Sequence, residues 1–285
     1  MIAPTAEPRG CVGESPRTFD EFEREGWGEA NVVAAYHERF GALTSQSIEP
    51  MLDAAGVGKG TRVVDVASGP GYVAAAAARR GAIATGVDFS DEQIALARRL
   101  NPGIEFRQGD ARDLPLEDEQ FDAVVSNYGM PHFPDADAFL REAQRVLRPG
   151  GRIAFATWAK PEEARAFGIV IDAVREHGEA PASIPAGPNF FRFSDPDECE
   201  RSLLAAGFED VTCTLVPQTW RLSSADDLID AMAEGTVRTA ALLRSQPRET
   251  LERIRAAARE AVRPYERYGL IELPTAAMLS SASKR

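Results

Sequence analysis

Short apolar runs alternate with helical patterns along the middle of the chain. The pattern predicts strands at residues 62–66, 82–88, 104–108, 121–126 and 152–158. Between the strands it predicts helices at residues 71–80, 90–100 and 135–147, the last one stopped by Pro149, Gly150 and Gly151. Strands and helices that alternate at this spacing are typical of a parallel, doubly wound sheet, so we expect an α/β fold.

The chain changes character before this core. Residues 1–17 are rich in Pro, Gly and Glu, and we expect them to form a disordered leader. The pattern over residues 18–60 predicts an N-terminal helical cap, with a break in the helix near residues 26–28.

The rhythm changes again after residue 160. Here the pattern predicts a helix at residues 195–206, a strand at 210–222, mostly helix over 224–264 and a last strand within 270–283. An apolar stripe within residues 224–264 fits a lid, a dimer interface or ordinary core. The protein could therefore be a monomer or a homodimer. The stripe consists of Met232, Val237, Leu242 and Leu243.

Composition limits the partners. The formal net charge is −12, from 44 acidic and 32 basic side chains in 285 residues. An acidic surface repels phosphate backbones and anionic membranes, so we expect neither nucleic acid nor a membrane as a partner. Cys11, Cys199 and Cys213 have no metal-ligand spacing, so no metal is predicted. The first residues lack the apolar core of a signal peptide, and the expected location is the cytoplasm.

A glycine turn joins the first strand of the core to its helix. Gly69, Gly71 and Ala74 match the pattern G-x-G-x-x-G/A, which many nucleotide-binding α/β proteins share. Asp65 stands four residues before Gly69. A carboxylate repels a pyrophosphate and attracts a cation, so Asp65 favours a cationic ligand such as S-adenosylmethionine (SAM) over a dinucleotide. No lysine follows the glycines, which argues against a P-loop.

Two acidic side chains stand at the ends of the next two strands. Asp88 lies roughly 20 residues past the glycine loop, where a carboxylate can accept both hydroxyls of a ribose. Asp88 also fits an acidic helix start, because Ser90 is a good N-cap. Asp110 fits an acceptor for an adenine amino group, with the Ala111 N–H donating to the ring, and it fits a simple Asx turn equally.

Five motifs then follow in order, namely DVASGPG, GVDFS, GDARDLP, FDAVVSNYGMPHFPD and VLRPGGRIAFATW. This set resembles the class I SAM-dependent methyltransferases, and most of all their small-molecule branch, typified by the ubiquinone and menaquinone biosynthesis methyltransferases. The likeness covers about residues 61–160 and continues more loosely back to Tyr36. It implies a Rossmann-like, seven-stranded sheet whose last strand is antiparallel, with N-terminal helices and a helical lid.

The resemblance also implies roles for single regions and residues. Residues 61–160 would be the SAM-binding core, and residues 161–285 would supply the acceptor-binding lid region and the last strands. The residues implied in SAM binding, together with Asp65, are Tyr36, Ala67, Gly69, Gly71, Asp88, Phe89, Gln93, Asp110, Ala111 and Asn127.

His132 follows the fourth strand, at the edge of the sheet where α/β folds bind their ligands. It is our candidate for a general base, and the alternative is a structural histidine beside the cofactor. Trp27, Tyr128 and Phe190 are candidates for an acceptor pocket, because aromatic walls suit a flat apolar ring. Each of them also fits ordinary core packing.

The predicted function is methyl transfer from SAM to oxygen, nitrogen or carbon of a small molecule, with an aromatic or indole-like natural product of secondary metabolism as one acceptor class. An NAD(P)-dependent oxidoreductase explains the glycines and Asp88, but not Asp65 or the GDARDLP motif. A non-catalytic binding protein on the SAM fold is the other alternative. A nucleic-acid methyltransferase is disfavoured by the charge and by the absence of an (Asn/Asp)-Pro-Pro-(Tyr/Phe) motif after the fourth strand.

Overall fold

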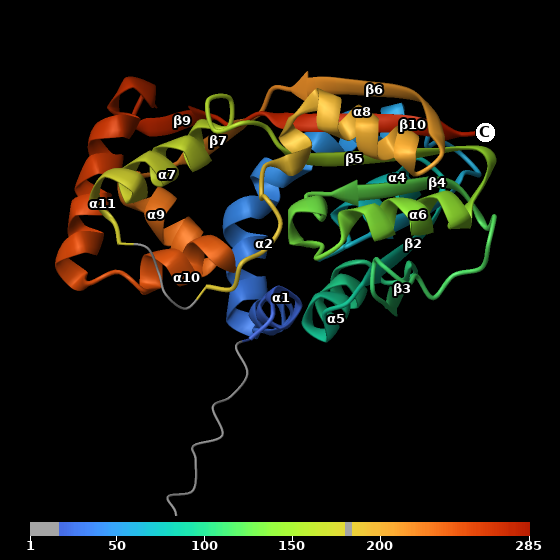
Figure 1. The fold of residues 1–285 in the computed structure, drawn as a ribbon, viewed down its shortest axis with the longest axis horizontal. Helices are drawn as coiled ribbons and strands as arrows, with labels where there is room; N and C mark the ends of the chain where they lie inside the picture. The colour runs from blue at the N-terminus through green and yellow to red at the C-terminus, as the bar shows by residue number, and fades with distance from the viewer. Residues whose placement is uncertain (1–16, 180–183) are drawn as a thin grey trace, which may run out of the picture.

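A seven-stranded sheet with helices on both faces forms the centre of the protein (Figure 1). The computed structural model describes residues 17–179 and 184–285, so the predicted leader lies, except for residue 17, outside the described residues. The strands of this sheet are β1 (Arg62–Val66), β2 (Ile83–Asp88), β3 (Glu105–Gln108), β4 (Phe121–Asn127), β5 (Leu147–Trp158), β6 (Phe208–Val216) and β10 (Ala277–Lys284).

The order of the strands is β3-β2-β1-β4-β5-β10-β6. β1 pairs in parallel with β2 and β4, and β5 pairs in parallel with β4. β10 runs antiparallel between β5 and β6. The expected Rossmann-like sheet with an antiparallel last strand is therefore confirmed.

The helices cover the sheet on both faces, as a doubly wound fold requires. α6 (Ala136–Val146) and α8 (Pro196–Ala205) pack on one face. The other face is covered by α3 (Ile48–Ala54), α4 (Tyr72–Arg79) and α5 (Asp91–Leu100). The chain reverses direction across the sheet between β1 and β4, so a crevice forms beyond the carboxyl ends of the central strands.

The N-terminal cap consists of α1 (Phe19–Trp27) and α2 (Ala30–Thr44). Thr18 and Glu21 form a capping box that fixes the start of α1. The predicted break at residues 26–28 is confirmed, because α1 ends at Trp27 and Gly28 is its C-cap. A second break, the 3-10 turn η1 (Ser45–Ser47), separates α2 from α3.

A helical layer closes one end of the molecule (Figure 1). Its helices are α7 (Arg165–His177), α9 (Ala225–Glu234), α10 (Arg238–Arg244) and α11 (Arg248–Val262). Met232, Val237 and Leu243 are buried within the chain, so most of the apolar stripe is core rather than a free face. The sequence analysis missed α7, although its apolar residues repeat at helical spacing. The single-turn helices are η2 (Met130–His132), η3 (Arg192–Ser194) and η4 (Arg263–Tyr265).

Two predicted strands are each divided between two sheets, which corrects the sequence analysis. The predicted strand at 210–222 is β6 followed by β7 (Thr219–Leu222), and the one at 270–283 is β9 (Leu270–Pro274) followed by β10. β7 and β9 pair with β8 (Glu266–Arg267) in a separate three-stranded sheet. Pro217 and Pro274 mark the divisions, because proline cannot donate to a strand ladder.

The end of the helix predicted at 135–147 also differs. α6 ends at Val146, and β5 begins at Leu147 and continues through Pro149 and Gly150. Leu147 pairs with Phe121 before a shift in the register of β4 and β5, so these residues extend the strand.

The described part of the chain contains no helix of the length and apolar character needed to cross a bilayer.

We predict that the Gly86→Ala substitution in β2 destabilises the fold. The added methyl group would stand 2.6 Å from Cε1 of the Phe106 ring, and overpacking of this kind costs about 1–3 kcal/mol. Gly58→Ala is the matched control, since a methyl group there meets nothing within 4 Å. Urea unfolding measures both variants. Equal midpoints for the two variants would contradict the packing argument.

Candidate functional site

The glycine loop lies where β1 ends and α4 begins. Ala67, Gly69 and Gly71 all have positive φ, at 56°, 50° and 81°. The Gly71 N–H donates to the Ser68 carbonyl over 2.9 Å, which closes the turn before α4. This backbone bends so tightly that the loop presents main chain, rather than bulky side chains, to the crevice.

Asp88, at the end of β2, ties this loop to the next helix. Its Oδ2 accepts from the Gly69 N–H and its Oδ1 from the Ser90 N–H, each over 2.9 Å. The residue is 6% exposed, and burial raises the pKa of its carboxyl group. Each oxygen of a carboxylate has two acceptor sites, so each one keeps a site for a ligand hydroxyl.

Asp65 lies behind the loop. Its Oδ2 accepts from the Ala74 N–H over 3.1 Å and so caps the first turn of α4. Its Oδ1 is buried and has no hydrogen-bond partner among the described residues. The side chain is 1% exposed, and burial raises its pKa to about 8.

A cavity of about 490 Å³ lies against the glycine loop, and a second one, of about 370 Å³, continues from it past Asp88 and Phe89. The lining of the first includes Trp27, Tyr36, Ala67, Gly69, Asp88, Phe89, Gln93, Asn127, Tyr128 and His132. Asp110 and Ala111 line the second.

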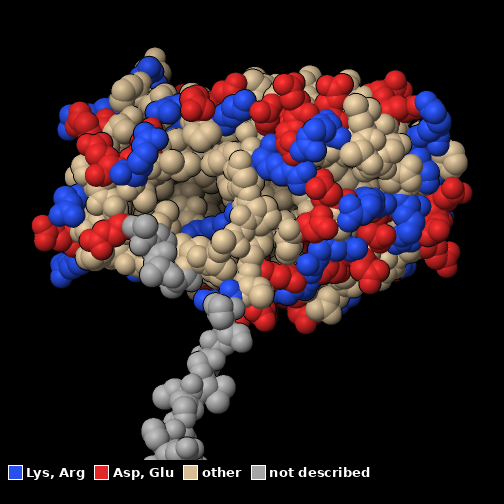
Figure 2. Space-filling view, in the orientation of Figure 1, with Lys and Arg blue, Asp and Glu red and all other residues tan. Residues whose placement is uncertain are grey.

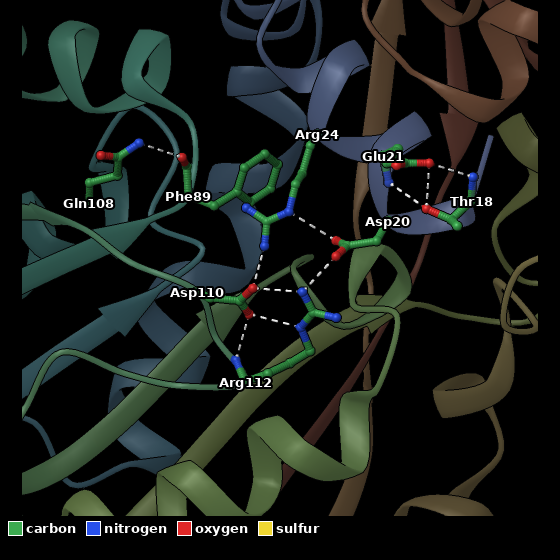
Figure 3. A network of polar contacts seen from close by, with 8 residues as sticks. All are labelled: Thr18, Asp20, Glu21, Arg24, Phe89, Gln108, Asp110 and Arg112. Carbon is green, nitrogen blue, oxygen red and sulfur yellow. Dashed lines mark hydrogen bonds and ion pairs between the residues drawn. The ribbon is translucent and has the colours of Figure 1, made fainter. Parts of the chain in front are cut away.

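The second cavity is bordered by a charged network that joins α1 to the end of β3 (Figure 3). Asp110 accepts three hydrogen bonds from Arg112, and Arg24 of α1 also donates to it. Asp20 of α1 accepts from both Arg24 and Arg112. Burial raises the pKa of Asp110, but the two arginines outweigh it and hold the pKa at about 2.

Arg24 also covers Phe89, its guanidinium carbon lying 5.1 Å from the centre of the ring. Asp110 is thus an ionised acceptor whose donors come from two separate elements. Arg24 donates only to Oδ2 of Asp110, so a ligand group that hydrogen-bonds to this oxygen competes with Arg24.

Asn127 and Tyr128 end β4 beside the first cavity. The Asn127 amide donates to the Thr44 carbonyl over 2.9 Å and accepts from the Ser47 hydroxyl over 2.8 Å, so its side chain is held by the N-terminal cap. Tyr128 has a φ of 63°, and its ring lies 4.0 Å from that of Trp158, centre to centre. Burial raises the pKa of the Tyr128 hydroxyl.

A third cavity, of about 410 Å³, lies between the N-terminal cap and the helical layer, and we call it the aromatic chamber. Figure 2 shows a hollow in this part of the molecule, lined mainly by uncharged residues and with basic atoms at its base. The chamber is lined by Trp27, Tyr36, Phe40, Tyr128, His132, Trp158, Phe167, Phe190, Thr236, Val237, Arg238 and Thr239.

His132 lines all three cavities, so it stands where they meet. Its Nδ1 lies 2.8 Å from Oε2 of Glu23. Glu23 lies in α1, is 2% exposed and also accepts from Arg238 over 3.0 Å. Burial raises the pKa of Glu23, but His132 and Arg238 outweigh burial and keep the pKa below its usual value.

The sequence analysis missed both Glu23 and Arg238. The available signal for Glu23 was that it shares a buried face of α1 with Phe19 and Trp27. Arg238 carried no such signal. Of the predicted site residues, Asp65 and Gly71 line none of the three cavities, and the others line at least one.

Comparison with known proteins identifies the class of the core. Residues 64–155 match a family model described as a methyltransferase domain. A demethylmenaquinone methyltransferase from Beutenbergia cavernae is 41% identical over 110 residues. That alignment covers 39% of this chain and 46% of the relative, so the chain spans less than half the length of the relative it matches.

Solved structures extend the likeness of the fold to nearly the whole chain. A phosphoethanolamine N-methyltransferase from Haemonchus contortus, in complex with S-adenosylhomocysteine (SAH), has a TM-score of 0.57 and 16% identity and covers 94% of this chain and 60% of that one. The [4+2]-cyclase SpnF also has a TM-score of 0.57, with 20% identity, and covers 96% of this chain and 99% of that one.

The fold and the matched residues define residues 64–155 as a class I SAM-dependent methyltransferase domain. Within the matched residues, the sequence resembles the demethylmenaquinone methyltransferases. Among residues 17–179 and 184–285, no three His, Cys, Asp or Glu side chains are grouped to hold a metal ion.

Because Asp65 is buried, we expect the stability of the fold to depend on pH. Its pKa of about 8 in the folded chain lies above the ordinary 3.8, so the folded state retains a proton that the unfolded state loses. The free energy of unfolding should therefore fall, by up to about 1.4 kcal/mol per pH unit, as the pH rises from about 4 to about 8.

Asp65→Asn removes this contribution and keeps an acceptor for Ala74. Guanidinium unfolding of both proteins at pH 5 and pH 7.5 measures the difference. The variant should gain stability relative to the natural protein at the higher pH. A difference that does not change with pH would show that Asp65 is not the group responsible.

Proposed function

We propose that this protein binds SAM in the first two cavities and transfers its methyl group to a small molecule held in the aromatic chamber. One observation carries the proposal: the cavity at the glycine loop and the aromatic chamber share Trp27, Tyr36, Tyr128 and His132 as walls. A donor and an acceptor bound on either side of His132 would be brought into proximity, which is the main catalytic contribution available to methyl transfer.

The residues of the first two cavities fit SAM. Gln93 Oε1 is buried at the first cavity and has no hydrogen-bond partner among the described residues, so a polar group is available to a ligand. Asp88 keeps acceptor sites for ribose hydroxyls, and Asp110 is an ionised acceptor at the adenine end. Asp65 lines neither cavity and keeps its proton up to a pH of about 8, so the charge expected to attract a cationic ligand does not support the proposal.

SAM supplies a methyl group activated by a positively charged sulfur. The acceptor atom bonds to that methyl carbon, the carbon–sulfur bond breaks with its electron pair left on sulfur, and the proton of the acceptor passes to a base. We assign the role of this base to His132, which stands at the junction of the cavities.

We propose a flat and mainly apolar acceptor, such as an aromatic or indole-like natural product. Trp27, Tyr128 and Phe190 supply aromatic walls that suit such a ring. The fold also serves a [4+2]-cyclase, so transfer of the methyl group itself has to be measured.

Cofactor binding is tested first. Calorimetry should show binding of SAM and SAH but not of NAD. Asp88→Asn should weaken the binding of SAH by about 10-fold to 100-fold, because hydrogen bonds to a charged group contribute about 1.5–3 kcal/mol each. Asp91→Asn, in the first turn of α5, is the matched control and should bind normally. Binding of NAD with no affinity for SAM or SAH would overturn the proposal.

The role of His132 is tested by transfer of labelled methyl from SAM to a panel of naphthols and indoles. His132→Asn should lower the rate of transfer by about 10²–10⁴-fold, the usual contribution of a general base, while SAH still binds. His177→Asn, at the end of α7, is the control variant. Undiminished transfer by His132→Asn would remove the base from the mechanism.

A further inference from the structure

A buried carboxylate stands behind His132, on the N-terminal cap. Glu23 Oε2 lies 2.8 Å from His132 Nδ1 and accepts from Trp27 Nε1 over 3.1 Å. The other oxygen, Oε1, accepts from Arg238 Nε over 3.0 Å. The cluster therefore joins three separate parts of the chain, α1, η2 and the start of α10.

These contacts determine which nitrogen of His132 carries the hydrogen. An ionised carboxylate can only accept, so the hydrogen between Glu23 and His132 must belong to Nδ1. Trp27 Nε1 also lies 3.4 Å from Nδ1, but Nδ1 cannot accept there while it donates to Glu23, so the indole hydrogen goes to Glu23. In the neutral ring, Nε2 is then the unprotonated nitrogen. It has no hydrogen-bond partner among the described residues.

Arg238 donates three of its five N–H groups within this cluster. Besides Glu23, it donates to the Pro188 carbonyl over 3.0 Å and to the Pro131 carbonyl. Its guanidinium also lies over the rings of Phe19 and Phe190, 4.4 Å and 5.4 Å from their centres. All three guanidinium nitrogens therefore have partners, and the positive charge is balanced by Glu23. The chamber wall therefore contains a cation whose charge is already paired with a buried carboxylate.

We propose that Glu23 is the positioning residue for the proposed base, and that the chamber selects an uncharged aromatic acceptor with a weakly acidic O–H group. This rests on the proposed function. Glu23 holds Nδ1–H and leaves Nε2 to take the hydroxyl proton. Arg238 keeps Glu23 ionised and, being neutralised in turn, provides no attraction for a carboxylate on the acceptor.

The tautomer of His132 tests the first half of the proposal. Nitrogen-15 NMR of histidine-labelled protein, with SAH bound and with the signal assigned through His132→Asn, should show hydrogen on Nδ1 and none on Nε2 at a pH where the ring is neutral. Hydrogen on Nε2 in the natural protein overturns the proposal, whatever any variant does.

Glu23→Leu with Arg238→Met then removes the carboxylate without leaving a buried cation unpaired. This double variant should lose the single Nδ1–H tautomer. Glu25→Gln, on the exposed side of the same helix, should keep it. An unchanged tautomer in a double variant that still binds SAH with normal affinity overturns the role of Glu23.

The second half is tested by binding to the SAH complex. 2-Naphthol, an uncharged ring with one hydroxyl, should bind at least 10-fold more tightly than 2-naphthoate, its anionic counterpart. Equal or tighter binding of naphthoate, or no binding of either, overturns the selection of an uncharged acceptor. Failure of the natural protein to bind SAH would instead refute the proposed function. The two failures can be distinguished, because the tautomer of His132 can also be measured without SAH.

Discussion

The hydrogen bonds of the Asp88 carboxylate hold the candidate site together. One oxygen fixes the main chain of the glycine loop after β1, and the other fixes the start of α5 after β2. Two neighbouring parallel strands thus end in loops that share one buried acceptor. Because a buried carboxylate is costly without partners, it constrains both loops to the positions where their N–H groups can reach it. The crevice beyond the sheet depends on that constraint.

The cap completes the site through charge as well as apolar packing. α1 reaches the core through Arg24, which donates to Asp110, and through Glu23, which contacts His132. The first contact borders the adenine end of the proposed SAM site, and the second lies at the aromatic chamber. A single short helix therefore contacts both ends of the proposed reaction site. Opening of this helix would disturb cofactor and acceptor together.

The helical layer supplies the wall of the aromatic chamber that lies opposite the core, with both apolar and charged side chains. Phe167 of α7 and Val237 beside α10 line it, and Arg238 joins the layer to the cap. Open α/β sheets bind their ligands at the carboxyl ends of the strands. The helices outside the core determine which residues lie opposite the ligand. This is why proteins with this fold can perform different reactions on a common core.

The order of strands and helices in the core, and most of the candidate cofactor-binding residues, could be predicted from the sequence alone. Hydrophobic periodicity, the turn after β1 and the acidic residues at the ends of β2 and β3 are local signals. They lie within a few residues of the elements they define. The crossings of the chain between two sheets at Pro217 and Pro274 became visible only in the folded protein. Only the tertiary structure placed Glu23, Arg238 and His132 together. These residues are far apart in the sequence, and the contact that gives each one its role depends on packing between elements, which no local pattern records.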